Sequence, residues 1–233
     1  MQWINQERAS QGVPPLAVDQ RLTEAARKHT SLMVEHQALS HQFDGEATME
    51  IRFADENLRS DQQAENVDVS KDVPSAHRGF MHSPPHRANI LNPNYNVVGV
   101  AVIRSGDRVY VTEDFAHRVT ASSEPEADAA LHRAIETYAT AHGMSPPVRK
   151  PQAQLRHMAC DMALNDSLQS QKAVDLPGVQ EVAAWTAAVP SDLPGSAKEL
   201  LSHPMPSGYS LGACFAPSVS QPGGIYWVVM IVY

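Results

Sequence analysis

The clearest hydrophobic pattern in the chain lies just after Asp19, where apolar side chains recur every three or four residues. This spacing predicts a long helix that begins at Asp19, because aspartate is a favoured residue at helix N-termini. The predicted inward positions of that helix are Leu22, Ala25, Ala26, His29 and Met33, with His36 as a further candidate. Further along, the apolar runs 97–103 and 108–116 are separated by a Ser-Gly-Asp turn, which predicts a β-hairpin. On its return strand Glu113 interrupts an apolar face, and such a carboxylate marks an edge or a site.

The remaining elements of the first half are shorter. Residues 3–12 predict a helix that a glycine ends, and residues 48–59 and 72–81 predict two more. In the second of these helices we expect Ile51, Phe53, Ala54 and Leu58 to point inward. The stretch 64–69 predicts a short strand that carries Glu65.

Two prolines at 84–85 separate His82 from a short predicted helix over residues 86–91. Proline forces the preceding residue into extended backbone, so His82 and His86 do not share one helical face despite their four-residue spacing. This excludes the paired-histidine zinc motif of a continuous helix. His86 is placed instead on the first turn of the short helix, next to the apolar strand that follows.

The second half repeats the pattern of the first. IETYATAHGM at 135–144 echoes INQERASQGV near the N-terminus, and a Pro-Pro pair follows each. Near the end, PGSAKELL matches PPHRANIL, which aligns Ser196 with His86, and nothing replaces His41. The closing apolar strand at 225–233 matches the return strand without its carboxylate, and we expect it to be core.

This repeat predicts three segments. Residues 1–118 form a first domain, residues 119–130 form a linker rich in Ser, Glu and Ala, and residues 131–233 form a degenerate second copy without the polar site residues. A repeat of this length indicates two duplicated domains rather than a solenoid, whose units are shorter.

Composition narrows the class of protein. The 233 residues carry 18 basic and 26 acidic side chains, a net charge of −8, which argues against nucleic acid and anionic membranes as partners. No apolar run reaches the roughly 18 residues of a spanning helix. The first residues lack a basic-then-apolar export signal, and we expect one to have been removed upstream. Cys160 and Cys214 allow one intrachain disulfide, and the repeat alignment makes them neighbours.

Four polar residues stand out as candidate chemistry: His41, Glu65, His86 and Glu113. Two neutral imidazoles can ligate Zn²⁺, and two carboxylates can orient them, complete the coordination shell or move a proton to water. We therefore consider His41 and His86 as metal ligands. Neither cysteine stands in an activating context, which weakens an acyl-enzyme mechanism.

The segments NQERASQGVPPL, LSHQFDG, AENV, SPPHRANILNPNYNVVGVAV and YVTEDFA resemble the CAP superfamily, in particular its bacterial SCP-like branch. The resemblance spans about residues 3–117. It implies an α+β fold, a three-layer α-β-α sandwich, with a cavity lined by His and Glu and an extracytoplasmic location. The family's motif histidines fall on His41 and His86 and its motif glutamate on Glu65, while Glu113 stands where bacterial members often have glutamine.

Two functions follow from the resemblance. The first is a secreted or periplasmic binding protein whose His/Glu cavity holds a divalent metal, with a small apolar ligand, a polysaccharide or a partner protein as its target. The alternative is a Zn²⁺-dependent hydrolase, in which Glu65 is the general base and His41 and His86 hold the metal. Family membership alone does not choose between them.

Overall fold

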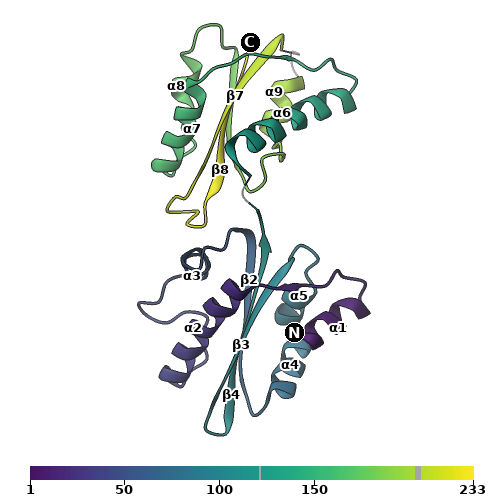
Figure 1. The fold of residues 1–233 in the computed structure, drawn as a ribbon, viewed down its shortest axis with the longest axis vertical. Helices are drawn as coiled ribbons and strands as arrows, with labels where there is room; N and C mark the ends of the chain where they lie inside the picture. The colour runs from purple at the N-terminus through teal and green to yellow at the C-terminus, as the bar shows by residue number, and fades with distance from the viewer. Residues whose placement is uncertain (121, 203–205) are drawn as a thin grey trace. The chain divides into compact units, whose positions relative to one another are not determined.

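The computed structural model of the chain describes residues 1–120, 122–202 and 206–233. Within them the chain divides into two compact units, Met1–Val119 and Thr120–Tyr233. Each unit is built on its own four-stranded sheet, with helices on both faces of that sheet (Figure 1). The predicted α+β class and its three-layer α-β-α arrangement are confirmed.

The sheet of the first unit has the strand order β1-β3-β4-β2, in which β1 and β3 are parallel and the other neighbours are antiparallel. Its elements are α1 (Gln2–Ser10), β1 (Ala17–Val18), α2 (Gln20–His36), α3 (Met49–Asp55), β2 (Ser60–Ser70), α4 (Val73–His82), α5 (Pro84–Leu91), β3 (Val97–Ser105) and β4 (Arg108–Arg118). Strand β2 is therefore an edge strand. The predicted hairpin is formed by β3 and β4, and Gly106 in its turn has a φ of 60°.

Helix α2 covers one face of this sheet. The Asp19 side chain caps it by accepting a hydrogen bond from the Arg21 backbone, and the hydrogen bonds of Arg21 lower the pKa of Asp19 to about 2. Five of the six predicted inward side chains are buried, whereas His36, in the last turn, is exposed because the helix ends there. A Cβ added at Gly99 of β3 would lie 2.1 Å from the Leu22 backbone carbon, so the helix packs directly on the strand and only glycine fits there.

The opposite face of the sheet packs against α1, α4 and α5 (Figure 1). Its core consists of Ile4, Leu16, Ala76, Phe80, Ile90, Tyr95, Val98, Val109, Val111 and Phe115. Arg8 on α1 is fully buried, and its guanidinium donates to the backbone carbonyls of Ile90 and Asn92 at 2.8 and 2.9 Å. These bonds satisfy the buried charge and attach α1 to the end of α5.

Two predicted elements differ in extent from those observed. The predicted helix 48–59 is shorter, because Asn57 takes a left-handed conformation with a φ of 59° shortly after α3 ends. Ile51, which was expected to point inward, is 39% exposed, whereas Phe53 and Leu58 are buried as predicted. The strand predicted at 64–69 extends over all of β2, since β4 pairs with it along most of its length.

The second unit has the strand order β5-β7-β8-β6, with a parallel β5–β7 pair and antiparallel neighbours otherwise. Its elements are α6 (Glu124–Ala141), β5 (Val148–Arg149), α7 (Gln154–Leu164), α8 (Gln171–Val174), β6 (Glu181–Ala187), α9 (Gly195–Ser202), β7 (Gly208–Ala216) and β8 (Ile225–Val232). The order and the directions of its strands match those of the first unit.

The predicted linker 119–130 is wrong in length, because α6 begins at Glu124 inside it. The Glu126 carboxylate accepts a hydrogen bond from the Ser123 backbone at 2.8 Å, and Pro125 lies in the first turn. These residues form a helix start, although their polar composition is also that of a linker. One linker position, residue 121, lies outside the described residues.

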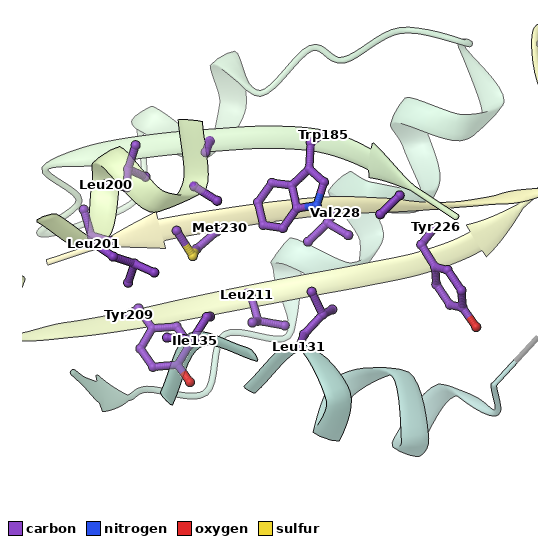
Figure 2. Packing of buried hydrophobic residues seen from close by; sticks show 14 of the residues in the cluster. Leu131, Ile135, Trp185, Leu200, Leu201, Tyr209, Leu211, Tyr226, Val228 and Met230 are labelled. Carbon is purple, nitrogen blue, oxygen red and sulfur yellow. The ribbon is translucent and has the colours of Figure 1, made fainter. Parts of the chain in front are cut away.

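The second unit is held by an apolar core and a disulfide. Figure 2 shows Trp185 of β6, Tyr209 and Leu211 of β7, and Val228 and Met230 of β8 in the core that faces α6 and α9. The closing strand β8 is buried, as predicted. On the other face, Cys160 of α7 and Cys214 of β7 form the disulfide, with their Cα atoms 5.1 Å apart.

Candidate functional site

The polar residues of the candidate site lie on β2 and β4. Glu65 pairs with Asp114 in the register of these strands, and Asn66 pairs with Glu113. Successive side chains of a strand point to opposite faces, and directly paired residues share a face. Glu65 and Asp114 therefore lie on the α2 face, and Asn66 and Glu113 lie on the α4–α5 face. The four predicted site residues are thus divided between the two faces of the edge strand.

On the α2 face, the structure brings His41 and Glu65 together. Nδ1 of His41 lies 2.9 Å from Oε1 of Glu65, and the His41 side chain is 62% exposed. Arg52 of α3 donates to the other carboxylate oxygen of Glu65 at 2.9 Å. Burial raises the pKa of Glu65, but the hydrogen bond from His41 and the charge of Arg52 outweigh it and lower the pKa. The buried carboxylate thus holds an exposed imidazole in place.

The Glu65 bond also changes the charge of His41. The hydrogen bond to Glu65 raises the pKa of His41 above its ordinary value, against a smaller effect of burial. With Nδ1 directed at the carboxylate, Nε2 is the ring nitrogen left for a ligand. His41 is accordingly an oriented donor that stays protonated to a higher pH than a free histidine.

Behind this pair lies a second polar layer, which the sequence reasoning missed. Nδ1 of His29 is 2.7 Å from Oε1 of Glu46, and its Nε2 is 2.9 Å from the backbone oxygen of Ser40. Nη1 of Arg52 is 3.5 Å from the same Glu46 oxygen. These contacts position the loop that leads to His41. His29 was predicted to point inward, and a buried histidine on an apolar helix face was the signal that a polar partner existed.

Asp114 completes the polar layer on this face. Its side chain is fully buried, and both carboxyl oxygens lack a hydrogen-bond partner among the described residues. Burial, followed by the charge of Glu65, raises the pKa of Asp114 well above its ordinary value. Asp114 therefore holds its proton to a higher pH than Glu65 does, which is the expected order for two neighbouring buried carboxyls.

On the α4–α5 face, Asn66 links His86 to Glu113. The Asn66 amide donates to the backbone oxygen of His86 and to Oε2 of Glu113, both at 3.2 Å. The Asn89 amide of α5 donates in turn to Oδ1 of Asn66 at 2.9 Å. Glu113 is 5% exposed, and burial raises its pKa to about 7. Neither asparagine was identified from the sequence as a site residue.

The His86 ring lies edge-on to Phe80, with ring centroids 5.3 Å apart. Burial lowers the pKa of His86, and the charge of His41 lowers it further. The charge of His41 thus reaches His86, although the two side chains belong to opposite faces of the sheet. We call the edge of β2 that carries these two histidines the β2 rim. The rim combines an exposed imidazole that favours the charged form with a half-buried one that favours the neutral form.

The donor set at this rim does not suit a zinc centre of the usual kind. Catalytic zinc sites use three protein ligands. Across the described parts of the chain, no group of three or more His, Cys, Asp or Glu side chains is arranged to hold a metal ion. His41 uses one ring nitrogen for Glu65, and Glu113 points to the other face. The predicted ligation of Zn²⁺ by His41 and His86 stays a prediction that lacks a third ligand.

Fold and site together define a CAP-type α-β-α sandwich with a histidine–carboxylate site at a sheet edge. The family model described as "Cysteine-rich secretory protein family" (CAP) matches residues 1–115. The first unit of the chain thus matches the CAP family, as its motifs predicted.

Two curated relatives are similar to part of this chain. A Bacillus subtilis strain 168 protein named "Uncharacterized protein YkwD" is 32% identical over 111 residues, which are 44% of this chain and 40% of the relative. A second protein of that strain, "Uncharacterized membrane protein YlbC", is 31% identical over 112 residues, which are 48% of this chain and 31% of the relative. The chain thus spans less than half the length of these curated relatives.

Two crystal structures extend the comparison. The SCP-domain extracellular protein of Bacillus anthracis str. Ames is 27% identical, with a TM-score of 0.46, and the match covers 50% of this chain and 39% of that one. The structure titled "Crystal Structure of Na-ASP-1" is 9% identical, with a TM-score of 0.50, and covers 94% of this chain and 80% of that one. The second similarity concerns the fold alone.

Proposed function

We propose that the first unit is an extracytoplasmic binding module that recognises a neutral, hydroxyl-rich polysaccharide at the β2 rim. The observation that carries this proposal is the His41–Glu65 pair, in which a buried carboxylate 2.9 Å away orients an imidazole that is 62% exposed. An ordered, exposed imidazole is a hydrogen-bond donor prepared for a ligand, because little rotamer freedom is left to lose on binding.

The polarity of the rim favours a polysaccharide over the other ligands considered. Small apolar ligands are bound in concave, mostly apolar pockets, whereas this rim presents His41 and His86 above a polar layer. The carboxylates of Glu46 and Glu65 are balanced locally by Arg52 and the imidazoles. With a net charge of −8, the chain as a whole opposes acidic polymers. A neutral polymer with many hydroxyl groups fits these charges.

Two observations bear on location and on the second unit. Disulfides persist in oxidising compartments, so the Cys160–Cys214 bond supports a secreted or periplasmic protein. Among the described helices, none combines the length and apolar character needed to cross a membrane. The shared strand order supports the second unit as a degenerate CAP copy. So do Gly99 and Gly212, where an added Cβ would strike the helix backbone in each unit.

The zinc hydrolase is not advanced as a second function, because no observation favours it over binding. Its mechanism needs a third metal ligand, and the described residues near His41 and His86 do not provide one. Glu65, its proposed general base, is held by Arg52 and His41 and has a lowered pKa, with burial acting in the opposite direction. A paired carboxylate of low pKa is a weak base.

The proposal is tested by co-sedimentation of the full chain with insoluble neutral polysaccharides, chitin and cellulose, beside alginate beads as the acidic polymer. We expect retention on a neutral polymer that His41→Ala and His86→Ala each reduce at least tenfold. His157→Ala, an exposed histidine of α7, is the matched control and leaves retention unchanged. Retention on alginate alone, or retention that neither substitution changes, contradicts the proposal.

A further inference from the structure

The second unit contains a cavity of about 420 Å³ beside the start of α6, the segment after β5, and strands β7 and β8. This volume lies in the range of small-molecule sites, roughly 300–1,000 Å³. Its base is lined by Leu211, Phe215 and Tyr226, and the last two rings pack edge to face with centroids 5.0 Å apart. The Tyr226 hydroxyl lies 2.9 Å from the Ser122 backbone nitrogen and anchors the chain that enters α6.

Charged side chains of both signs line the same cavity. Arg149 donates to Oδ2 of Asp128 at 2.8 Å, with the side chains 53% and 40% exposed. Arg156 pairs with Glu124, and these side chains are 54% and 67% exposed. Exposed ion pairs contribute little stability, so their partners can be exchanged for a ligand's charged groups. Two cationic and two anionic side chains give the cavity lining no net charge. This disfavours a ligand whose charges are all of one sign.

A buried polar side chain stands behind this lining. His132 of α6 is 8% exposed, and its Nδ1 lies 2.5 Å from the Tyr209 hydroxyl. Its Nε2 is 3.5 Å from Oδ1 of Asp128 and has no hydrogen-bond partner among the described residues. A buried nitrogen that lacks a partner is rare in folded proteins. This one lies next to Asp128 of the cavity, although His132 itself does not line it.

We propose that this cavity binds a small zwitterion with an apolar body, of the class of a free dipeptide with an aromatic side chain. The ligand's carboxylate pairs with Arg149 or Arg156, and its ammonium pairs with Asp128 or Glu124, so each displaced partner finds a new counter-charge. The aromatic side chain packs on Phe215 and Tyr226, where stacked or edge-on ring contacts are favourable. This site is separate from the His41 rim and does not depend on its function.

The test is calorimetric titration of the full chain with the dipeptide Ala-Phe, beside its uncharged analogue N-acetyl-Ala-Phe-amide. We expect saturable one-to-one binding of the zwitterion and binding of the uncharged analogue at least tenfold weaker. Arg149→Gln and Asp128→Asn should each weaken zwitterion binding at least tenfold, because each removes one of the charges that the ligand pairs with. Both substituted side chains are partly exposed, so these variants retain the fold.

Two controls separate this site from the first unit. Arg27→Gln removes an exposed arginine of α2 that pairs with Glu24, and it leaves dipeptide binding unchanged. His41→Ala also leaves dipeptide binding unchanged, whereas it reduces polysaccharide retention at least tenfold, so the two proposals fail independently. The inference is overturned by absence of Ala-Phe binding, by equal binding of the uncharged analogue, or by binding that both cavity variants retain.

Discussion

The inner strands β4 and β8 occupy the same place in two sheets of identical strand order, yet their side chains differ in kind. Gly99 pairs with Asp114 in the first unit, and Gly212 pairs with Val229 in the second. This register aligns the polar run Thr112, Glu113 and Asp114 with the apolar run Trp227, Val228 and Val229. All six side chains are buried. The same topology is thus built once around polar groups and once around an apolar core.

The helices that cover these strands differ in the same way. If Leu22 and Leu155 are aligned through their contacts with the two glycines, His29 and Thr30 of α2 correspond to Met162 and Ala163 of α7. The Thr30 hydroxyl donates a hydrogen bond to the Thr112 hydroxyl at 2.8 Å. At the corresponding place in the second unit, Ala163 and Trp227 belong to one apolar cluster. Since the second unit folds without these polar groups, the fold does not require them. Their burial in the first unit therefore indicates a function.

The largest expected effect comes from removing the cation of the first unit's polar layer. Arg52→Met leaves Glu46 and Glu65 buried without their guanidinium, and breaking a buried charge pair costs about 3–5 kcal/mol. Urea unfolding should show this loss in the free energy of unfolding. Arg27→Met, at an exposed pair, should change it by less than about 1 kcal/mol. Equal stability of the Arg52 variant and the wild type would mean that the polar layer does not depend on this ion pair.

The second unit should respond to reduction instead. The Cys160–Cys214 bond spans 54 residues and ties α7 to β7, and the loss of such a link destabilises by about 2–4 kcal/mol. We expect the double variant Cys160→Ala, Cys214→Ala to lower the midpoint of thermal unfolding, followed through the fluorescence of Trp185 and Trp227. Reductant should lower the wild-type midpoint to the same value and leave the variant unaffected. If reductant also lowered the unfolding midpoint of the double variant, the effect of reductant could not come from the Cys160–Cys214 bond.

The stability of the first unit should fall as the pH rises through neutrality, because of Glu113. Folding raises its pKa to about 7 from the ordinary value of 4.5, so the folded state binds the proton more tightly. The stabilisation is complete below the ordinary pKa and is lost as pH rises through about 7, up to about 3 kcal/mol in all. Glu113→Gln removes this loss of stability, since an amide carries no charge. In the second unit the aligned position is Val228, so β8 has no ionisable side chain there.

The measurement is the free energy of urea unfolding at about pH 5 and about pH 8. We expect the wild type to lose more stability over this interval than Glu113→Gln, with the variant the more stable protein at the higher pH. Taking the difference between the two proteins removes the contributions of other carboxyls. Identical pH profiles would show that Glu113 does not titrate in this range.

Much of the fold was predictable from the sequence because its signals are local. Asp19, the spacing of the apolar residues after it, and the Ser-Gly-Asp turn each act within a few residues, and α2 and the β3–β4 hairpin were found through them. The linker at 119–130 was wrong because Ser123 and Glu126 cap a helix with the same polar residues that a linker uses. Whether such residues begin a helix depends on the apolar face that follows and packs.

The site was predictable only in part. His41 and Glu65 were identified as candidate site residues, and the structure brings their side chains together. His29, Arg52 and Asp114 were not identified, because their roles arise from contacts between α2, α3, β2 and β4 that are distant in sequence. The division of the site between two faces could have been deduced from strand alternation, since Glu65 precedes Asn66. The predicted grouping of all four residues in one His/Glu cavity ignored that alternation.

The smallest effect concerns the two histidines themselves. Glu65 raises the pKa of His41, whereas burial and the charge of His41 lower that of His86, so His41 should titrate at the higher pH. Glu65→Gln should lower the pKa of His41, because a neutral amide stabilises the imidazolium less than a carboxylate does. Glu24→Gln, at an exposed α2 position, is the matched control and should leave both titrations unchanged. The pKa values are read from the pH dependence of the imidazole C–H resonances in NMR spectra.

The same titration tests whether the two faces of β2 form one site. In the Glu65→Gln variant, His41 should lose its proton at a lower pH. If the two faces form one site, the pKa of His86 should then rise, because the positive charge of His41 no longer disfavours protonation of His86. The second unit offers no equivalent pair, because Ser196 aligns with His86 and Ala184 with Glu65. A His86 titration that is independent of His41 would separate the rim into two unrelated histidines and leave His41 alone as the ligand-binding group.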